Sequence, residues 1–527
     1  DPNLGTPQVR RVGINPTTLA AGDVANTGAG AYAATLRYYR LRYGHFSAAS
    51  GGTIYRRSEP TNVVSITPTG TGAAIRITRT APSEQETHWE VEGSTDNITF
   101  YRIAGNDHAT VAAIPIATTT YDDSIAPSTY ATTGAVSEAS GFFSRPPSAK
   151  FGITDGNRLI IGGSWETATP FGSRIWFTPV LGSSDKGDDE RLNTSATAKA
   201  FADLNEKDGG DITGIGGPIN GVIWGYKYRR IYRLVPTGDV SVPYLVREVS
   251  HVIGAINHKS IVLAEDATGN PAIYFLSYKG PYRISSSGLE YLGRDIEDQW
   301  YGLNTQSAVN LGATNIVCHS IYHATLNQVW WWVATGSSNN PDTILCLDVK
   351  QATRKDEFGV RGGWSKFTGD MAAGRCSVLF SNTLGATMSL DLKPHIGMTL
   401  VGPRILKCDT GTDDAGTDFQ AYVKTRSLVP AERLTSKHAV YDTTLVAKAQ
   451  SGVTITETID RDFLRETRTA SAVLTAAASE TRVMVKMDAG QMAGAGAIQI
   501  QLGDSAAADN TWSLEALLVP ILSEEQR

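Results

Sequence analysis

Residues 222–236 read VIWGYKYRRIYRLVP, in which VIWGYKY (222–228) and RIYRLVP (230–236) are two short runs rich in β-branched and aromatic residues. Two such runs close together in the chain are typical of an antiparallel β-hairpin. A sheet built from such hairpins hides its apolar face only by packing against neighbouring sheets. The stretch therefore predicts β-structure that must be repeated along the chain.

Similar pairs of runs recur on both sides of this stretch. LIIGG (159–163) precedes RIWFTPV (174–180), AIYFLSY (272–278) precedes PYRISS (281–286), and QVWWWVA (328–334) precedes TILCLDV (343–349). Steps of about 50 to 60 residues with several strands per step are typical of propeller blades. We therefore expect residues 147–398 to form a β-propeller of about five to seven blades, which residues 1–57 join through a strand at Arg37–Tyr43.

Two further blocks flank or interrupt this region. Residues 58–146 contain strand-like runs separated by polar turns, and Pro60 and Pro146 stand near their ends. Their stretch WEVEGSTDNITFYRIAG (89–105), followed by TTTYDDS (118–124), resembles fibronectin type III modules, in which Trp89 would be a core residue. Residues 399–527 have fewer aromatic residues and several alternating strands, which predict a C-terminal antiparallel β-sandwich.

Composition agrees with an all-β chain and excludes some function classes. The 527 residues include 52 glycines and 22 prolines, only 19% are charged, and few windows show a helical apolar period. The net charge of −6 argues against a protein whose main task is to grip a phosphate backbone, which needs a basic face. Because every apolar run is far shorter than about 20 residues, we expect no membrane segment.

The sequence offers candidate reactive groups but no supported catalytic or metal motif. His319 and His323 beside Cys318 have i, i+4 spacing, but NIVCHSIYH is typical of a strand, on which the two rings are too far apart to share an ion. The acidic run 185–190 lacks the ligand spacing of a calcium loop, and Gly214–Pro218 precedes strands rather than a phosphate-binding helix. We therefore predict no catalytic residue, no metal and no cofactor, and hence no enzyme. The cysteines are expected to be reduced thiols without function: Cys318, Cys346, Cys376 and Cys408.

The densest cationic feature is the segment Tyr226–Arg233. If it is one strand, Tyr226, Tyr228, Arg230 and Tyr232 share one face, and Lys227, Arg229, Ile231 and Arg233 share the other. Such a strand could pack its tyrosines and pair its arginines with nearby carboxylates, or it could contact nucleic acid or a neighbouring subunit. The residues predicted as subunit contacts are Arg229, Arg230 and Arg233.

The stretch DGGDITGIGGPINGVIWGYKYRRIYRL (208–234), preceded by RIWFTPVLGSSDKGDD (174–189), resembles an element of bacteriophage virion proteins. Together with a propeller, an inserted fibronectin-like module and a C-terminal sandwich, it is similar to the tail nozzle, or tail hub, of short-tailed phages. The resemblance implies a virion protein made in the host cytoplasm that forms a homo-oligomeric ring, with six copies suspected. Its implied partners are a tail adaptor above the ring, tail fibres or spikes, and genomic DNA that passes without tight binding.

Two alternatives remain open at this point. One is a glycan-binding or sialidase-like propeller, against which the incomplete Asp-box at Ser183–Gly187 counts. The other is a receptor-binding or baseplate protein of a longer-tailed phage, which the sequence does not separate from a nozzle.

Overall fold

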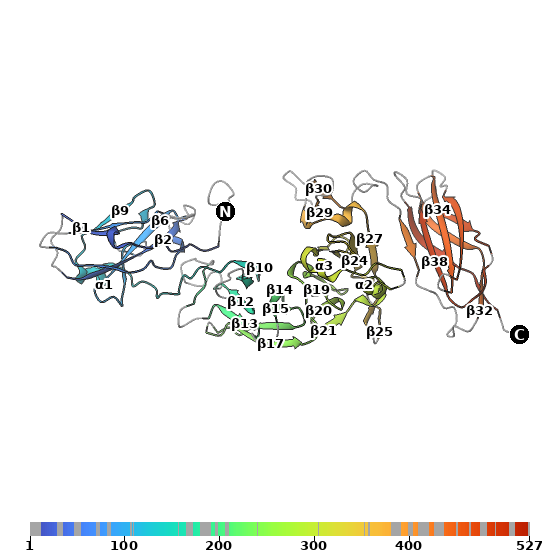
Figure 1. Cartoon of the computed structure of the whole chain (residues 1–527), viewed down its shortest axis with the longest axis horizontal. Helices are drawn as coiled ribbons and strands as arrows, with labels where there is room; N and C mark the ends of the chain where they lie inside the picture. Colours follow the sequence, from blue (N-terminus) through green and yellow to red (C-terminus); the bar gives the residue numbers. More distant parts are fainter. Residues whose placement is uncertain are drawn as a thin grey trace. The chain divides into compact units, whose positions relative to one another are not determined.

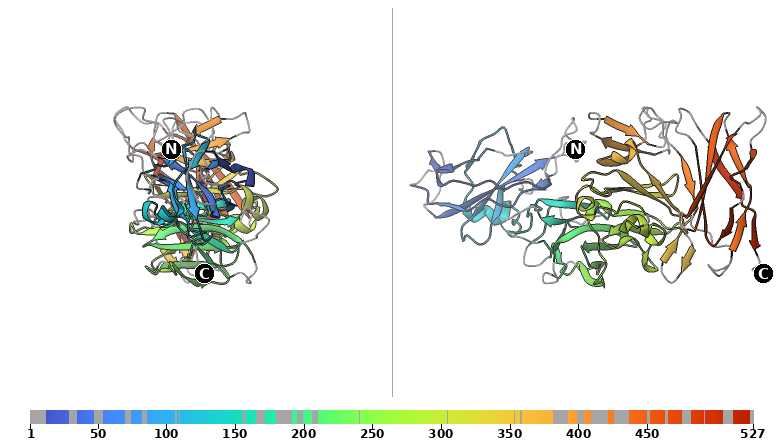
Figure 2. Two further views of the ribbon diagram at one scale, coloured as in Figure 1. Left: turned by 90° about the vertical axis from the view of Figure 1, so that its left-hand side faces the viewer. Right: turned by 45° about the vertical axis from the view of Figure 1, so that its right-hand side comes forward.

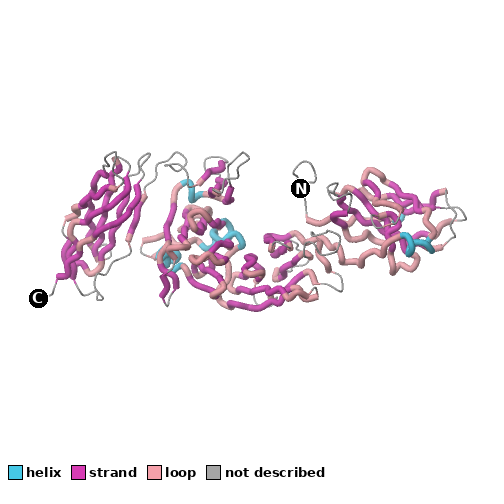
Figure 3. The backbone as a smooth tube through the Cα atoms, turned by 180° about the vertical axis from the view of Figure 1, so that it is seen from behind, coloured by secondary structure: helices cyan, strands magenta, loops and turns pink. Residues whose placement is uncertain are grey.

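The computed structural model shows a chain that is almost entirely β-structure, with only short helical turns between antiparallel sheets (Figure 3). The all-β class predicted from the sequence is confirmed. The chain divides into two compact units, Asp1–Val329 with Leu347–Trp364, and Trp330–Cys346 with Ser365–Arg527. The structure describes residues 12–28, 35–46, 54–69, 74–81, 86–105, 108, 110–155, 158–164, 172–179, 191–194, 199–205, 210–239, 241–303, 305–352, 354–356, 359–380, 392–398, 404–408, 421–425, 437–449, 452–462, 465–474, 482–490, 492–504 and 512–524.

The first sheets of the chain form a sandwich around one apolar core (Figure 1, blue). One sheet has the strand order β1 (Val24–Thr27), β5 (Ala74–Thr78) and β9 (Thr120–Asp123). The other has the order β3 (Ile54–Arg57), β2 (Arg37–Phe46), β6 (His88–Ser94) and β7 (Tyr101–Ala104), with β4 (Val64–Ile66) paired to β2 and β8 (Ile114–Pro115) paired to β6. Helix α1 (Tyr130–Thr133) adds Tyr130 to the core.

Strand β2 belongs to this sandwich and not to the later sheets. It pairs with β6 in continuous register from Tyr38–Ser94 to Gly44–His88. Its alternate residues Tyr39, Leu41 and Tyr43 are fully buried in the same core as Trp89. This contradicts the boundary drawn at residue 58 and the expectation that Arg37–Tyr43 joins the propeller, because the strand's apolar face is already covered here.

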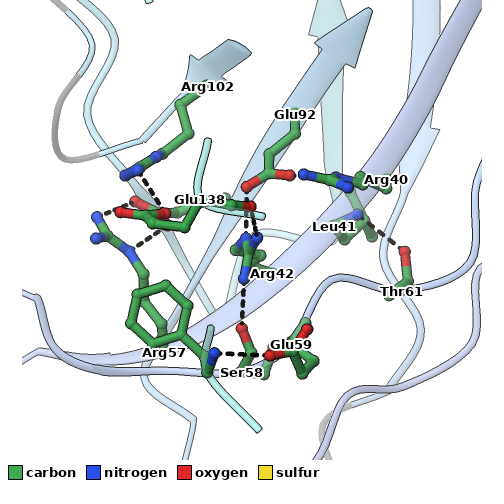
Figure 4. A network of polar contacts seen from close by, with 12 residues as sticks. Arg40, Leu41, Arg42, Arg57, Ser58, Glu59, Thr61, Glu92, Arg102 and Glu138 are labelled. Carbon is green, nitrogen blue, oxygen red and sulfur yellow. Dashed lines mark hydrogen bonds and ion pairs between the residues drawn. The ribbon is translucent and has the colours of Figure 1, made fainter. Parts of the chain in front are cut away.

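The opposite face of β2 is charged and is nevertheless buried (Figure 4). Arg42 lies at its centre, with its Nε 2.5 Å from Glu92 and two further donors on the backbone carbonyls of Ser58 and Glu138. Arg40 pairs with the second oxygen of Glu92, and Arg102 pairs with Glu138 at 2.7 Å. These ion pairs attach the segment around Glu138 to the sheet. Burial disfavours the charged form of Glu92, but Arg42 and Arg40 outweigh it, so the pKa of Glu92 lies below its usual value.

Four four-stranded sheets follow one another along the chain, most with strands in chain order (Figure 1, cyan to yellow). The first holds β10 (Ala149–Thr154), β11 (Leu159–Ser164), β12 (Arg174–Phe177) and β13 (Phe201–Asp203). The second holds β14 (Ile212–Ile219), β15 (Val222–Lys227), β16 (Ile231–Pro236) and β17 (Tyr244–Ser250). The third holds β18 (Val262–Glu265), β19 (Pro271–Ser277), β20 (Gly280–Ser285) and β21 (Gly288–Tyr291). The fourth holds β22 (His319–His323), β23 (Gln328–Val333), β24 (Thr343–Asp348) and β27 (Trp364–Phe367).

The first three of these sheets cover one another's faces. Ile175 and Phe177 of the first sheet share a core with Ile223 and Leu234 of the second. On its other face the second sheet packs Trp224 and other residues against the third. Glycines allow the close approach, because a Cβ on Gly214 would lie 2.5 Å from the Ile261 side chain. Short helices and 3₁₀ turns connect these strands: η5 (His258–Ser260), η6 (Gly293–Ile296), α2 (Glu297–Tyr301) and α3 (Leu311–Val317).

The remaining strands form smaller sheets and a second sandwich-like body. A hairpin joins β25 (Arg354–Asp356) and β26 (Gly359–Arg361), and β28 (Cys376–Phe380), β29 (Lys393–Met398) and β30 (Arg404–Lys407) form a three-stranded sheet. The C-terminal strands surround one core that extends from Val440 to Leu502 (Figure 2, orange to red). Their sheet orders are β31 (Tyr422–Lys424), β38 (Ile498–Asp504), β34 (Val453–Arg461), β35 (Glu466–Leu474); β37 (Met492–Ala495), β32 (Lys437–Val440), β40 (Ile521–Glu524); and β36 (Val483–Met487), β33 (Thr443–Ala449), β39 (Trp512–Leu518).

A second buried glutamate lies in this C-terminal core without a cationic partner. Glu457 is fully buried, and its Oε1 accepts a hydrogen bond of 2.5 Å from the Thr443 hydroxyl. Its Oε2 is buried and has no hydrogen-bond partner in the described part of the chain. Burial raises the pKa of Glu457 despite the Thr443 hydrogen bond, which lowers it.

The first prediction concerns the N-terminal sandwich as a folding unit. A fragment of residues 1–146 should fold alone, because its core and its ion pairs are complete within it. Deleting residues 58–146 from the full chain should instead leave β2 without β6 and expose Tyr39 and Tyr43. Dispersed amide resonances for the fragment, and aggregation of the deletion variant, are the expected results. A fragment with the spectrum of an unfolded chain would contradict this assignment.

The second prediction contrasts two of the buried glutamates, Glu92 and Glu457. Glu92→Gln should destabilise the N-terminal sandwich at pH 7 by about 3 kcal/mol, because two arginines lose a buried partner. Since the folded pKa of Glu92 is lowered, this stabilisation exists above the unfolded pKa and is lost as pH falls through the folded one.

Glu457→Gln should act in the opposite direction. The folded pKa of Glu457 is raised, so its contribution to stability is present at low pH and is lost as pH rises through that value. The glutamine variant should therefore be more stable than wild type by about 1 kcal/mol at pH 7, with the difference vanishing near pH 4. Hydrogen exchange of β6 and β34 during urea unfolding measures both effects, and equal responses of the two variants would refute the contrast.

Candidate functional site

The three predicted contact residues lie at and after the turn between β15 and β16. The Lys227 amide donates to the Arg230 carbonyl at 2.9 Å, so the chain reverses between them. The segment Tyr226–Arg233 is thus not one strand, and its predicted faces are wrong. Tyr226 packs towards the third sheet, whereas Tyr232 packs towards the first. The turn also leaves Arg229 exposed and Lys227 buried, with the Lys227 ammonium 2.9 Å from the Ser173 hydroxyl.

Arg229 takes part in an aromatic–cationic cluster formed by two adjacent hairpin turns. We define the cluster as Tyr228 and Arg229 from the β15–β16 turn, Tyr278 and Lys279 from the β19–β20 turn, and Tyr301 from the end of α2. The Tyr228 and Tyr278 rings stack with centroids 5.5 Å apart at 18°. The Arg229 Cζ lies 5.3 Å and the Lys279 Nζ 5.7 Å from the Tyr278 ring centroid. Both cations therefore lie within cation–π distance of the Tyr278 ring.

Helix α2 supports the cluster from one side. The Trp300 indole donates to the Tyr278 carbonyl at 3.3 Å, and the Tyr301 hydroxyl donates to the Lys279 carbonyl at 3.3 Å. Tyr301 is 52% exposed and Tyr228 is 37% exposed, so the cluster reaches solvent. Burial and, after it, the nearby Glu297 and Tyr278 raise the pKa of Tyr301. The cluster therefore presents the neutral Tyr301 phenol beside two cations.

The other two predicted arginines are separated from this cluster. Arg230 pairs with Glu248 of β17 at 2.8 Å, which ties the turn to the edge of its own sheet. Arg233 lies on β16, directly opposite Arg247 of β17, and is exposed. The structure thus places the three arginines in three different environments.

The sequence did not indicate Tyr278, Lys279 or Tyr301, although a signal for two of them exists. Tyr228 and Tyr278 are 50 residues apart, as are Arg229 and Lys279, which is the spacing at which the ends of two hairpins match at Tyr232 and Tyr282. An alignment of the two hairpin sequences at this 50-residue spacing therefore places the β15–β16 turn on the β19–β20 turn. Tyr301 belongs to a helix outside the repeat, and no local pattern predicts its position.

The arrangement can bind another molecule but offers no acid–base pair of its own. Stacked tyrosines and cation–π contacts are typical of surfaces that hold flat or anionic groups. Tyrosine and arginine are also the residue types enriched at the centres of protein–protein contacts. The ion pairs around Arg42 form a denser polar network (Figure 4), but Arg42 and Glu92 are fully buried.

The other sequence candidates lie elsewhere or outside the described residues. His319 and His323 lie on β22, a strand as expected, and burial lowers the pKa of His319 to about 4. Burial also raises the pKa of the Cys318 thiol. No group of three or more His, Cys, Asp or Glu side chains that could hold a metal occurs in the described ranges. The acidic run 185–190 lies outside them, and Gly214–Pro218 lies within β14, where Gly214 serves sheet packing.

Among the residues that the structure covers, no helix has the length and apolar composition needed to cross a membrane. No protein-family model and no curated protein sequence matches the chain.

Several solved structures match at low similarity. A family 43 arabinoxylan arabinofuranohydrolase from Bacillus subtilis, in complex with cellotetraose, is 8% identical over 85% of this chain and 93% of its own, with a TM-score of 0.21. A family 32 β-fructofuranosidase from Bombyx mori, a mutant in complex with sucrose, is 9% identical over 96% and 91%, with a TM-score of 0.20. A second structure of that enzyme is 10% identical over 86% and 88%, with a TM-score of 0.17.

These matches contradict the prediction that the chain is not an enzyme, because all three are structures of glycoside hydrolases. The absence of catalysis is therefore no part of the function proposed below. With TM-scores near 0.2, the matches carry no argument about a substrate or a mechanism either.

Proposed function

We propose that the chain is a structural subunit of a bacteriophage virion that assembles with copies of itself into a ring. The observation that carries this proposal is the exposed aromatic–cationic cluster, in which two tyrosines and two cations from successive hairpin turns reach solvent together. Contacts of this composition stabilise protein interfaces through a few dominant residues. A closed ring needs such a patch on each copy to meet a different patch on the next.

The place of the ring in the virion follows from the resemblance of residues 174–189 and 208–234 to virion proteins. On that basis the ring is a tail nozzle, with about six copies, below an adaptor and in contact with fibres or spikes. In the same proposal the stacked four-stranded sheets are blades of a propeller and the N-terminal sandwich is a fibronectin type III module. The mutual covering of the first three sheets supports the propeller assignment.

The charge of the subunit suits a conduit for DNA. Each phosphate contact with a cation strengthens binding, and a basic lining would retain DNA in transit. The chain carries a net charge of −6, and most of the arginines described above pair with carboxylates. A ring of such subunits should let DNA pass without holding it.

The third prediction tests assembly through the cluster. Arg229→Ala and Tyr278→Ala should each weaken association of the purified protein by about thirtyfold, as loss of a dominant interface residue does. Sedimentation velocity and negative-stain imaging measure the ring. Arg76→Ala is the matched control, because Arg76 is an exposed arginine on β5 that pairs with Asp122. Wild-type protein that stays monomeric, or cluster variants that assemble like wild type, would refute the proposal.

The fourth prediction concerns DNA. Wild-type protein should bind a fluorescein-labelled duplex no more tightly than about 1 μM at physiological salt, the upper range of non-specific binding. Fluorescence anisotropy over a series of salt concentrations measures this. Tighter, salt-sensitive binding would contradict a conduit through which DNA slides.

A further inference from the structure

The sheet β14–β17 uses its two faces differently. On one face Ile223, Leu234 and Tyr244 pack against the first sheet. On the other face Trp224, Tyr226 and Ile231 pack against the third. The third sheet covers only the inner strands on that side, because the outer residues of β16 and β17 remain exposed.

These outer residues form one continuous surface. In the register of β16 and β17, Arg233 lies opposite Arg247 and Val235 lies opposite Leu245, so all four side chains project from the same face. Leu245 is 44% exposed, and both arginines are exposed. Val249 adjoins them beyond a bulge and is 41% exposed. We call Arg233, Val235, Leu245 and Arg247 the Arg233–Arg247 surface.

The arginine pair differs from most other cross-strand arginines in the described strands, although Arg354 also lies opposite Arg361 in the β25–β26 hairpin. In the described strands, seven in-register pairs place an arginine opposite a carboxylate: Arg40–Glu92, Arg42–Glu90, Arg76–Asp122, Arg102–Glu92, Arg174–Asp203, Arg283–Glu290 and Arg461–Glu466. Arg233 instead faces Arg247, and like charges placed directly opposite one another destabilise a sheet. Neither arginine has a carboxylate partner among the described residues. An anion placed at this position would neutralise the two arginines.

The position of β17, the strand that carries Arg247, indicates what kind of molecule could supply the anion. β17 is the last strand in the order of its sheet, so no strand of the described residues pairs with its outer backbone edge there. An extended peptide can add to such an edge through main-chain hydrogen bonds, with side chains on alternate residues giving specificity. The neighbours of the arginine pair are the aliphatic residues Val235, Leu245 and Val249, which favour a protein segment as the partner. A surface that binds nucleic acid would carry further cations at these positions.

We propose that the Arg233–Arg247 surface docks an extended segment of a different protein chain, which adds a strand to β17. The segment places a carboxylate against Arg247 and an apolar residue two positions away against Leu245. The carboxylate neutralises the arginine pair, and the apolar residues bury Leu245 and Val249. This inference rests on the register of one sheet and is independent of the proposed phage function.

The test uses the full chain and a fluorescein-labelled synthetic peptide in which valine, glutamate and valine alternate with threonine. Fluorescence anisotropy should show saturable binding to wild type. Arg247→Ala, and the peptide with glutamine in place of glutamate, should each weaken binding by about tenfold or more. Arg76→Ala, the control arginine variant, should bind like wild type. Because Arg247→Ala removes a like-charge contact, its melting temperature should be no lower than that of wild type.

Each other outcome overturns the inference. No binding to wild type at about 1 mM peptide, or equal binding of the glutamate and glutamine peptides, would remove the proposed partner. Tighter binding of a DNA oligonucleotide with the same dependence on Arg247 would assign the surface to nucleic acid. Loss of self-association in Arg247→Ala would assign it to a second copy of this chain. Since the cluster variants at Arg229 and Tyr278 leave this surface intact, failure here is distinguishable from failure of the ring.

Discussion

Every sheet in this chain has two faces to cover, and the fold depends on how each face is covered. Strand β2 covers its two faces in different ways. Tyr39 and Leu41 lie in an apolar core, whereas Arg40 and Arg42 on the other face both pair with Glu92. In the first three of the four-stranded sheets, the apolar faces of successive hairpins cover one another. Arg42 and Glu92 can be buried together because each charge has an opposite charge beside it.

Sheet packing also determines what the surface can do. When two successive four-stranded sheets pack face to face, their central hairpin turns lie side by side. The stacking of Tyr228 on Tyr278 is a direct consequence, and it brings Arg229 and Lys279 to one ring. A surface cluster thus arises from an internal repeat: the same position of two hairpins carries an aromatic residue followed by a cation.

The sequence predicts those features that depend on local pattern. The hairpins at 222–236 and 272–286 and the strand character of His319–His323 follow from alternation and turn residues. The burial of Trp89 is instead what the resemblance of residues 89–105 to fibronectin type III modules implies. The pairing of Arg37–Phe46 with His88–Ser94 could not be predicted, because a strand pattern does not name its partner across about 50 residues of chain. Nor could the charged face of β2 be predicted as buried, since the segment that covers it, around Glu138, has no regular period.

The contrast between buried and exposed charge explains why an arginine pair can persist on β16 and β17. In a core, burial disfavours an unpartnered charge and shifts the pKa of the group towards its neutral form, as the raised pKa of Glu457 shows. An arginine cannot lose its charge in this way, because a guanidinium stays protonated over the pH range in which proteins are folded. At the surface, water and salt screen Arg233 from Arg247, so their repulsion costs little in the free protein. That repulsion grows when a neighbouring chain excludes the water, and only a partner that supplies a carboxylate can then bind without penalty. An exposed like-charge pair beside aliphatic side chains therefore selects its partner by charge, whereas the aliphatic side chains alone would accept any apolar segment.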